Sequence, residues 1–383
     1  MFVYIFLIVF CFLLSFVKQT KTVERFAFVV IAFILCFGYM TGSDWRMYEL
    51  WYEQKLVYEE EILYGILSDF FRFIGVGFWT FFTLLKVILL AVFFLVYKRF
   101  EAPLFFCMML FIAMIGLYLF IDNPMRSLIT YAIFAYSTKY IVSRDFWKYL
   151  LCTIIAVGFH QSAIIVLPLY FLYRLEMKNW VLIFLLVLVN ILFVSQQAVF
   201  SIIEFIKPYI PFAGDLIAKY TSAVRAHPYL AEFDYQVFSI GLAIKIFWFV
   251  VLLYYKDRII EQFKYGKLVL MLAFCAIILS RITLTVPIFV RVTLFFEVFY
   301  IVAIGYLLLL LSKRNRMVVK IILLAYTLFI TQRLVTSDFR YIPYTNVIIH
   351  SIRGDRPSYE ERSWHNFRHS PHHIEGTEYF VYH

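Results

Sequence analysis

The chain has 383 residues, of which 63% are hydrophobic and 16% are charged. This content is well above the roughly 45–50% apolar residues of soluble domains, which excludes an ordinary soluble globular protein. The formal net charge of +10 does not indicate a nucleic-acid partner, because the basic residues are spread over short connections between apolar runs. We therefore expect an integral membrane protein.

Apolar runs that can cross about 30 Å of hydrocarbon recur from end to end. The first run has no basic residue before it and no small-residue cleavage site after it, which predicts a retained helix and not a signal peptide. The ten predicted transmembrane helices cover residues 1–17, 26–41, 77–97, 102–121, 127–142, 180–195, 236–255, 268–286, 288–311 and 317–335. All five cysteines lie in apolar runs, which predicts buried thiols without disulfides or thiol chemistry.

Connections rich in Lys and Arg mark the cytoplasmic side of a membrane protein. Such connections lie within residues 18–25, 98–99, 139–148, 174–178, 256–267 and 313–316. This orientation places two longer loops outside, residues 42–76 and 196–235. We expect one polytopic domain over residues 1–335, followed by a polar extracytoplasmic segment over residues 336–383.

The stretch between Lys148 and Arg174 is apolar but is interrupted near Gly158 and His160, and both of its flanks are basic. A single span here would invert every later loop, so the charge pattern favours a re-entrant helical hairpin with His160 at its tip, next to a water-filled cavity. The alternative is an ordinary span whose basic flanks snorkel. The expected fold class is thus an all-α polytopic membrane protein with about ten transmembrane helices and a re-entrant hairpin, with a GT-C-like arrangement as one option.

Asp44 follows the second predicted span directly, in the sequence Gly-Ser-Asp-Trp-Arg-Met-Tyr that also holds Arg46 and Tyr48. A carboxylate at this outer face can act as a base or bind a cation. The alternative is that Asp44 caps a short surface helix through the first-turn amides.

Several arginines fall near the same predicted outer face. Arg126 lies in a tight turn after Asn123 and Pro124, Arg281 and Arg291 flank another turn, and Arg333 ends the last span. Glu297 is an alternative ion-pair partner for Arg291. Because guanidinium groups bind phosphate oxygens in pairs, this excess of arginines indicates a polyanionic ligand in the outer leaflet, such as a lipid pyrophosphate.

His160 could move a proton near neutral pH, or it could be a structural histidine in a kinked helix. The four histidines of the tail, at positions 369, 372, 373 and 383, have no metal-binding spacing, so we expect a flexible tail and no metal site. The chain has no phosphate-binding glycine loop and no dinucleotide fingerprint, so no cofactor is expected.

Several short motifs together resemble the EpsG family of Wzy-type polysaccharide polymerases. These are Gly42-Ser43-Asp44 with Tyr48, Asn123-Pro124-Met125-Arg126, Gly158-Phe159-His160-Gln161-Ser162, Val290-Arg291 and Ile342-Pro343-Tyr344. The resemblance extends over roughly residues 25–345. Trp45 stands where the family usually has Tyr, and Ser127 where it frequently has Gln.

The resemblance implies a bacterial inner-membrane glycosyltransferase. It would join undecaprenyl-diphosphate-linked oligosaccharides outside the cytoplasm. Membrane lipid surrounds such a protein, and a chain-length regulator is a candidate partner. For this reaction we assign Arg126, Arg281 and Arg291 to the diphosphate, because negative charge grows on it as it departs, and His160 or Asp44 to the base. Arg46, Tyr48, Arg333 and Tyr344 are further candidates for binding the sugar. A flippase for the same lipid and a membrane glycan ligase or O-acyltransferase are the alternatives.

Overall fold

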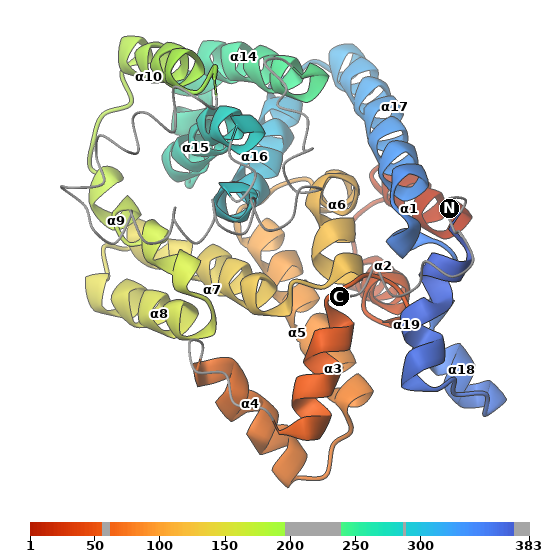
Figure 1. Ribbon diagram of the computed structural model, residues 1–383. Helices are drawn as coiled ribbons and strands as arrows, with labels where there is room; N and C mark the ends of the chain where they lie inside the picture. Colours follow the sequence, from red (N-terminus) through yellow and green to blue (C-terminus); the bar gives the residue numbers. More distant parts are fainter. Residues whose placement is uncertain (56–61, 196–238, 286–288, 371–383) are drawn as a thin grey trace. The chain divides into compact units, whose positions relative to one another are not determined.

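The computed structural model describes residues 1–55, 62–195, 239–285 and 289–370 (Figure 1). Within these residues the chain is almost entirely helical, and one sheet pairs two short antiparallel strands, β1 (Gly38–Tyr39) and β2 (Thr345–Asn346). The chain forms two compact units. One contains residues 1–170 together with those from 304 onward, and the other contains residues 171–303.

The first unit holds most of the helices. Its elements are α1 (Phe2–Leu14), α2 (Lys21–Leu35), β1, α3 (Trp45–Gln54), α4 (Ile62–Phe73), α5 (Phe78–Arg99), α6 (Leu104–Phe111), the π-helical turns η1 (Ile112–Gly116) and η2 (Tyr118–Asp122), α7 (Met125–Val142), α8 (Phe146–Phe159), the 3-10 helix η3 (Gln161–Val166), α17 (Lys313–Ser337), the 3-10 turn η5 (Phe339–Tyr341), β2, α18 (Val347–Arg353) and α19 (Tyr359–Arg368). The second unit holds α10 (Asn179–Leu192), α14 (Ile240–Gln262) and α15 (Gly266–Thr285). α9 (Leu169–Leu172) and α16 (Val290–Leu310) each cross a boundary between the units.

The core of the first unit is built around α6, whose eight residues are all apolar and all buried. A helix that is apolar on every side is stable only when other helices surround it. α1, α5 and α17 pack against α6. Gly305 permits a close approach here, since a Cβ at this position would lie 2.9 Å from Cys107 Sγ.

The chain reverses direction at His160, as the sequence predicts. α8 lies beside α7 (Figure 1), and the segment after His160 returns along α8. The Tyr149 hydroxyl donates to the Val166 carbonyl at 2.6 Å, and the Tyr170 hydroxyl donates to the Arg144 carbonyl at 2.8 Å. These bonds tie the two arms of a helical hairpin together. Its depth in a membrane stays a prediction.

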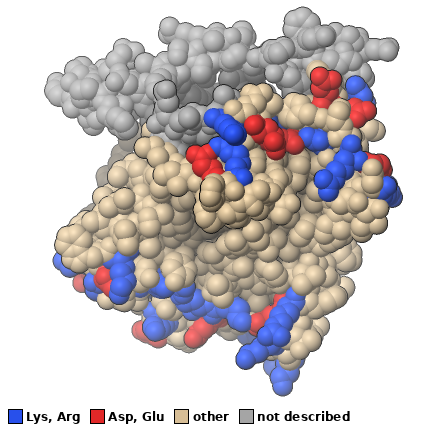
Figure 2. Space-filling view, turned by 90° about the horizontal axis from the view of Figure 1, so that it is seen from below, with Lys and Arg blue, Asp and Glu red and all other residues tan. Residues whose placement is uncertain are grey.

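The surface and the helix lengths confirm an all-α membrane protein. Among the described residues, α5, α15, α16 and α17 are long and apolar enough to cross a bilayer. α17 exposes a row of large apolar side chains, Met317, Val318, Ile321, Ile322 and Phe329. Figure 2 shows broad uncharged surface between groups of charged side chains. The predicted spans coincide with helices, for example residues 77–97 with α5, while the number of ten spans and the GT-C-like arrangement stay predictions.

The prediction of a flexible tail is wrong for residues 339–370, which form η5, α18 and α19. α19 begins with a capping box between Ser358 and Glu361, and it buries Arg362, Asn366 and Phe367. The sequence hides this packing because most of the buried side chains are polar and need specific partners. The three histidines at positions 372, 373 and 383 lie outside the described residues, as does the predicted loop over residues 196–235.

Candidate active site at the motif loops

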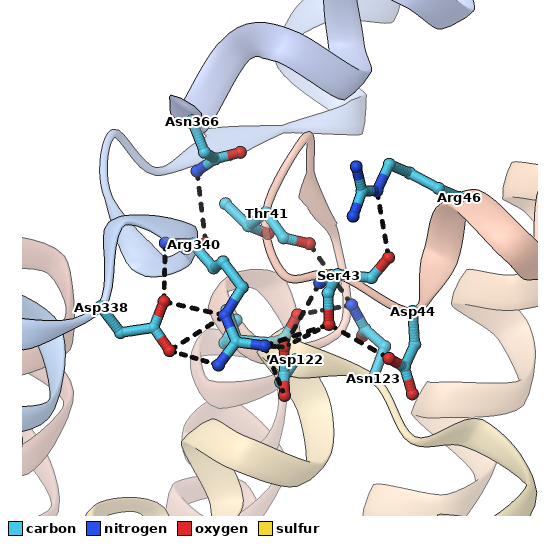
Figure 3. Close-up of polar contacts among 10 residues, drawn as sticks. Thr41, Ser43, Asp44, Arg46, Asp122, Asn123, Asp338, Arg340 and Asn366 are labelled. Carbon is cyan, nitrogen blue, oxygen red and sulfur yellow. Dashed lines mark hydrogen bonds and ion pairs between the residues drawn. The ribbon is translucent and has the colours of Figure 1, made fainter. Parts of the chain in front are cut away.

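Three segments that are far apart in the sequence meet beside the β1–β2 pair. They are the Gly42-Ser43 loop, the Ile121-Asp122 turn and the backbone around Arg340 (Figure 3). Gly42 has φ +80°, and a Cβ there would lie 1.9 Å from the Ile121 carbonyl oxygen. Its amide donates to the Arg340 carbonyl at 2.9 Å. Only glycine fits this contact, which explains its place in the motif.

The Arg340 guanidinium joins these segments. Its Nε donates to Asp338 Oδ1 at 2.8 Å, and its Nη1 lies 3.2 Å from Asp122 Oδ1 and 3.2 Å from Ser43 Oγ. The Ser43 hydroxyl also donates to Asp122 Oδ1 at 2.9 Å. Burial raises the pKa of the Asp122 carboxyl, and Arg340 and Ser43 oppose this shift. Arg340 is therefore neutralised within the protein and acts as a cross-link.

The Asn123 turn rests on a buried lysine. Asn123 has φ 66°, a left-handed conformation that asparagine tolerates. Its side-chain oxygen accepts a hydrogen bond from Lys86 Nζ at 3.1 Å. Lys86 is 1% exposed, and its ammonium also lies 4.9 Å from the centre of the Phe82 ring. This support fixes the turn that begins α7.

Asp44 and Arg126 both interact with Tyr48, which is buried. The Tyr48 hydroxyl accepts hydrogen bonds from the Arg126 amide at 3.4 Å and from Arg126 Nε at 3.3 Å. The Arg126 guanidinium also lies 5.6 Å from the centre of the Trp51 ring. Burial raises the pKa of Tyr48, Arg126 lowers it and Asp44 raises it. Two predicted site residues from separate motifs thus act on one phenol.

Asp44 occupies the N-cap position of α3, but its side chain makes no capping hydrogen bond. Its Oδ1 lies 3.1 Å from Ser43 Oγ, whose single proton is shared between Asp44 and the nearer Asp122 carboxylate. The simple capping role is therefore not the one observed. The neighbouring Arg46 donates from Nε to the Ser43 carbonyl at 3.3 Å, which keeps it on the same loop.

The His160 turn packs against α4, which belongs to the first of the two loops predicted to lie outside. Gly158 precedes this turn, and a Cβ there would lie 2.5 Å from Leu63 Cδ1 of α4. α3 and α4 contact each other through Tyr48 and Tyr64, whose ring centres are 5.2 Å apart. The loop over residues 42–76 therefore carries Asp44 on one helix and contacts the His160 hairpin with the other.

Two candidates for sugar binding lie elsewhere in the first unit. Arg333 is exposed on the last turns of α17. The Tyr344 hydroxyl donates to the Ile34 carbonyl at 3.0 Å and accepts from Asn346 at 3.0 Å, so it connects β2 to the end of α2. These bonds give Tyr344 a structural role in the described state.

Arg281 and Arg291 belong to the second unit. Arg281 is 2% exposed, and its Nε donates to the Phe193 carbonyl at 2.9 Å. Arg291 is exposed at the start of α16. Glu297, the alternative partner of Arg291, forms an ion pair with Lys245, which also donates to Ser280 Oγ at 2.7 Å. A ligand shared by these arginines and Arg126 stays a prediction.

Sequence reasoning did not identify Lys86, Asp122, Asp338 or Arg340. Asp122 directly precedes the Asn-Pro-Met-Arg motif, and Arg340 lies two positions before the Ile-Pro-Tyr motif. The available signal for Asp122 and Arg340 was that each is a charged residue close to a motif. No local pattern shows that these residues pair, because Arg340 and Asp122 are 218 positions apart.

The model of the EpsG family matches residues 21–346. The chain belongs to the EpsG family. This is a Wzy-like polysaccharide polymerase family, so the resemblance seen in the motifs is confirmed. No curated protein and no solved structure matches the chain. The EpsG match contains the Gly42-Ser43 loop, the Ile121-Asp122 turn and Arg340, whereas α18 and α19 follow it.

Proposed function

We propose that this EpsG-family protein polymerises undecaprenyl-diphosphate-linked repeat units at the outer face of the bacterial inner membrane. The observation that supports this most directly is the convergence of Asp44 and Arg126 on Tyr48, at the start of α7. A carboxylate and a guanidinium from two motifs lie around one buried phenol. Glycosyl transfer from a lipid diphosphate needs a base and a cation in one place.

In the proposed reaction, a sugar hydroxyl of one lipid-linked chain attacks the anomeric carbon of another. A new C–O bond forms, the bond from that carbon to the diphosphate oxygen breaks, and the hydroxyl proton passes to a base. Negative charge develops on the departing lipid diphosphate, and fixed cations in a site of low dielectric stabilise it. Arg126 is positioned for this task because Tyr48 and Trp51 hold its guanidinium.

Asp44 and His160 are the two candidates for the base. Asp44 and Arg126 both act on Tyr48, and these three residues are called here the Arg126 cluster. His160 lies on the hairpin that packs against α4. Arg281 and Arg291 of the second unit complete the proposed set of cations. The released diphosphate leaves with the lipid, so no nucleotide is consumed.

The test is the length of surface polymer in a deletion strain that is complemented with variants at matched membrane levels. Arg126→Ala should leave single repeats at the cell surface without long chains, and Arg126→Lys should give a partial defect because Lys binds phosphate as a point charge. The matched control is Arg99→Ala, since Arg99 also lies on a tyrosine ring, 4.9 Å from the centre of Tyr136, but at the other end of α7. This control should make normal polymer.

Normal polymer in Arg126→Ala would refute the assignment of this arginine. The absence of any repeat at the surface would favour the flippase. Asp44→Asn and His160→Gln separate the two base candidates, because the variant of the true base should lose polymer at every pH while the other keeps at least partial activity.

A further inference from the structure

The C-terminal arm is defined as residues 347–370 with α18 and α19. Its helix α18 and Arg356 line one side of a largely apolar groove. The first turns of α5 also line this groove, together with Phe37, Tyr39 and Glu53. The groove has a volume of about 780 Å³, within the range of roughly 300–1,000 Å³ that is typical of ligand sites. Leu84 on one wall and Ile352 on the other are 43% and 80% exposed. Because α5 is long and apolar enough to cross a bilayer, the hydrocarbon chain of a lipid suits this apolar surface.

A second cavity of about 630 Å³ adjoins this groove, and Arg356 lines both. Arg353 and Arg368 also line the second cavity, which is called here the basic cavity. Two acids also line it. Asp355 lies 3.1 Å from His350 Nδ1, and Glu361 accepts from the Ser358 amide at 2.7 Å. The three arginines of this cavity outnumber its two acids, so its formal charge is positive.

An ion pair and several aromatic rings hold the arm against the rest of the first unit. Arg362 of α19 is buried, and its Nη2 lies 2.6 Å from Glu49 Oε1 of α3. Its guanidinium lies against several aromatic rings, with centre distances of 5.5 Å to Tyr39, 5.7 Å to Trp45 and 5.8 Å to Trp79. Trp79 Nε1 donates to the same Glu49 oxygen at 3.0 Å. We name this cluster the clasp.

We propose that the groove and the basic cavity together bind a second lipid-linked diphosphate substrate, with its first isoprene units against α5 and its diphosphate among Arg353, Arg356 and Arg368. An apolar channel that opens into a cluster of arginines is complementary to an amphiphile with an anionic head. The inference rests on the proposed function, since polymerisation consumes two lipid-linked molecules at once. In this proposal the Arg126 cluster binds one of these two molecules, and the cavities of the arm bind the other.

Most of the groove lies within the family match, which ends at residue 346, whereas the three arginines of the basic cavity follow it. The groove lies at the N-terminal end of α5, which the charge pattern predicts to be the outer end, and this position suits a lipid whose chain stays in the bilayer and whose head projects outward.

The test is the binding of a C55 polyprenyl diphosphate to the full-length protein in nanodiscs of neutral lipid, with stoichiometry from native mass spectrometry. The wild type should bind two molecules. Arg353→Gln/Arg356→Gln/Arg368→Gln should bind one at the same concentration, because loss of charge-assisted hydrogen bonds weakens the arm site by at least about tenfold. Val87→Trp, which fills the groove, should have the same effect.

Two controls match these variants. Leu95→Trp places the same bulky ring on an outward position of α5, where Leu95 is 56% exposed. Lys313→Gln/Arg314→Gln removes exposed charge at the start of α17. Both controls should bind two molecules. Phosphatidylglycerol and inorganic diphosphate, added as competitors, should each leave the second polyprenyl diphosphate bound.

Equal stoichiometry in the wild type and both arm variants would overturn the inference. Displacement of the second polyprenyl diphosphate by phosphatidylglycerol would also overturn it, because it would indicate a general site for anionic lipids. Polymer assays separate this result from failure of the proposed function. If Arg126→Ala abolishes polymer while the arm variants bind and polymerise like the wild type, the polymerase function is supported and the arm site is refuted. If Arg126→Ala also makes normal polymer, both the arm site and the proposed function are refuted.

Discussion

Substitution of Arg340 by alanine should destabilise the motif loops. Arg340 lies against Asp122, which is 7% exposed, and it also binds Asp338. Removal of one partner from a buried ion pair costs about 3–5 kcal/mol. Because 36% of the Arg340 side chain is exposed, water replaces part of the lost interaction, and we expect a loss of about 2 kcal/mol.

The assay is a double-mutant cycle with Arg340→Ala, Asp122→Asn and the double variant, measured as the free energy of unfolding in detergent. Asp122→Asn removes the uncompensated charge, so the double variant should be less destabilised than the sum of the single variants by about 1 kcal/mol or more. Additivity within about 0.5 kcal/mol would refute the pairing.

The same variant should show a distinct pH dependence. Burial raises the pKa of Asp122 and Arg340 lowers it, so the pKa should rise further without Arg340. A carboxyl group with a raised pKa binds a proton more readily in the folded state, and this makes folding more favourable as pH falls. Arg340→Ala should therefore regain stability relative to the wild type as the pH falls from neutral towards the ordinary carboxyl pKa of about 3.9. No such gain is expected when Asp122→Asn is also present.

Three further predictions concern the loops and the arm. Gly42→Ala should abolish polymer and lower the thermal midpoint, because its Cβ would overlap the Ile121 carbonyl; wild-type behaviour of this variant would show that the loop can relax. Arg362→Ala should expose α19 to protease, and Glu49→Gln should do so to a smaller degree, since it keeps a hydrogen-bond acceptor beside Arg362; equal protection in all three proteins would contradict the clasp. Burial lowers the pKa of His365 to about 4, so the packing of α19 should weaken as the pH falls from about 6.5 to about 4. Hydrogen exchange of the α19 amides should report this weakening in the wild type, and His365→Gln should show no such pH dependence.

The helices could be predicted from the sequence because each depends on local composition. A run of about 20 apolar residues must satisfy its own backbone hydrogen bonds in lipid, and helix formation is the only local way to do so. The predicted span 77–97 is accordingly α5, and the interruption at His160 is a reversal of the chain. Side chains with distant partners carry no such signal.

The candidate site was predictable only in part. The motifs pointed to Asp44, Tyr48 and Arg126, and the structure brings these residues together. The Arg340–Asp122 pair depends on the meeting of β1 with β2, which pairs Gly38 with Asn346 across most of the chain. No periodicity in the sequence reports such a contact.

The C-terminal arm was missed for a related reason. Its buried groups include Arg362 and Asn366, residue types that are mostly exposed in proteins. Their burial becomes favourable only with Glu49 and the aromatic rings of distant elements in place. The polar composition of the arm predicts a segment exposed to solvent, yet the same residues form a packed helix.

The central claim is tested most directly by reconstitution of the purified protein with lipid-diphosphate-linked repeat units as the only substrate. The account predicts a ladder of longer glycans, with one lipid diphosphate released for each new glycosidic bond, and loss of both products in Arg126→Ala. Ladder formation that does not depend on Arg126, or transport of intact lipid-linked repeats across the bilayer without any new bond, would contradict it.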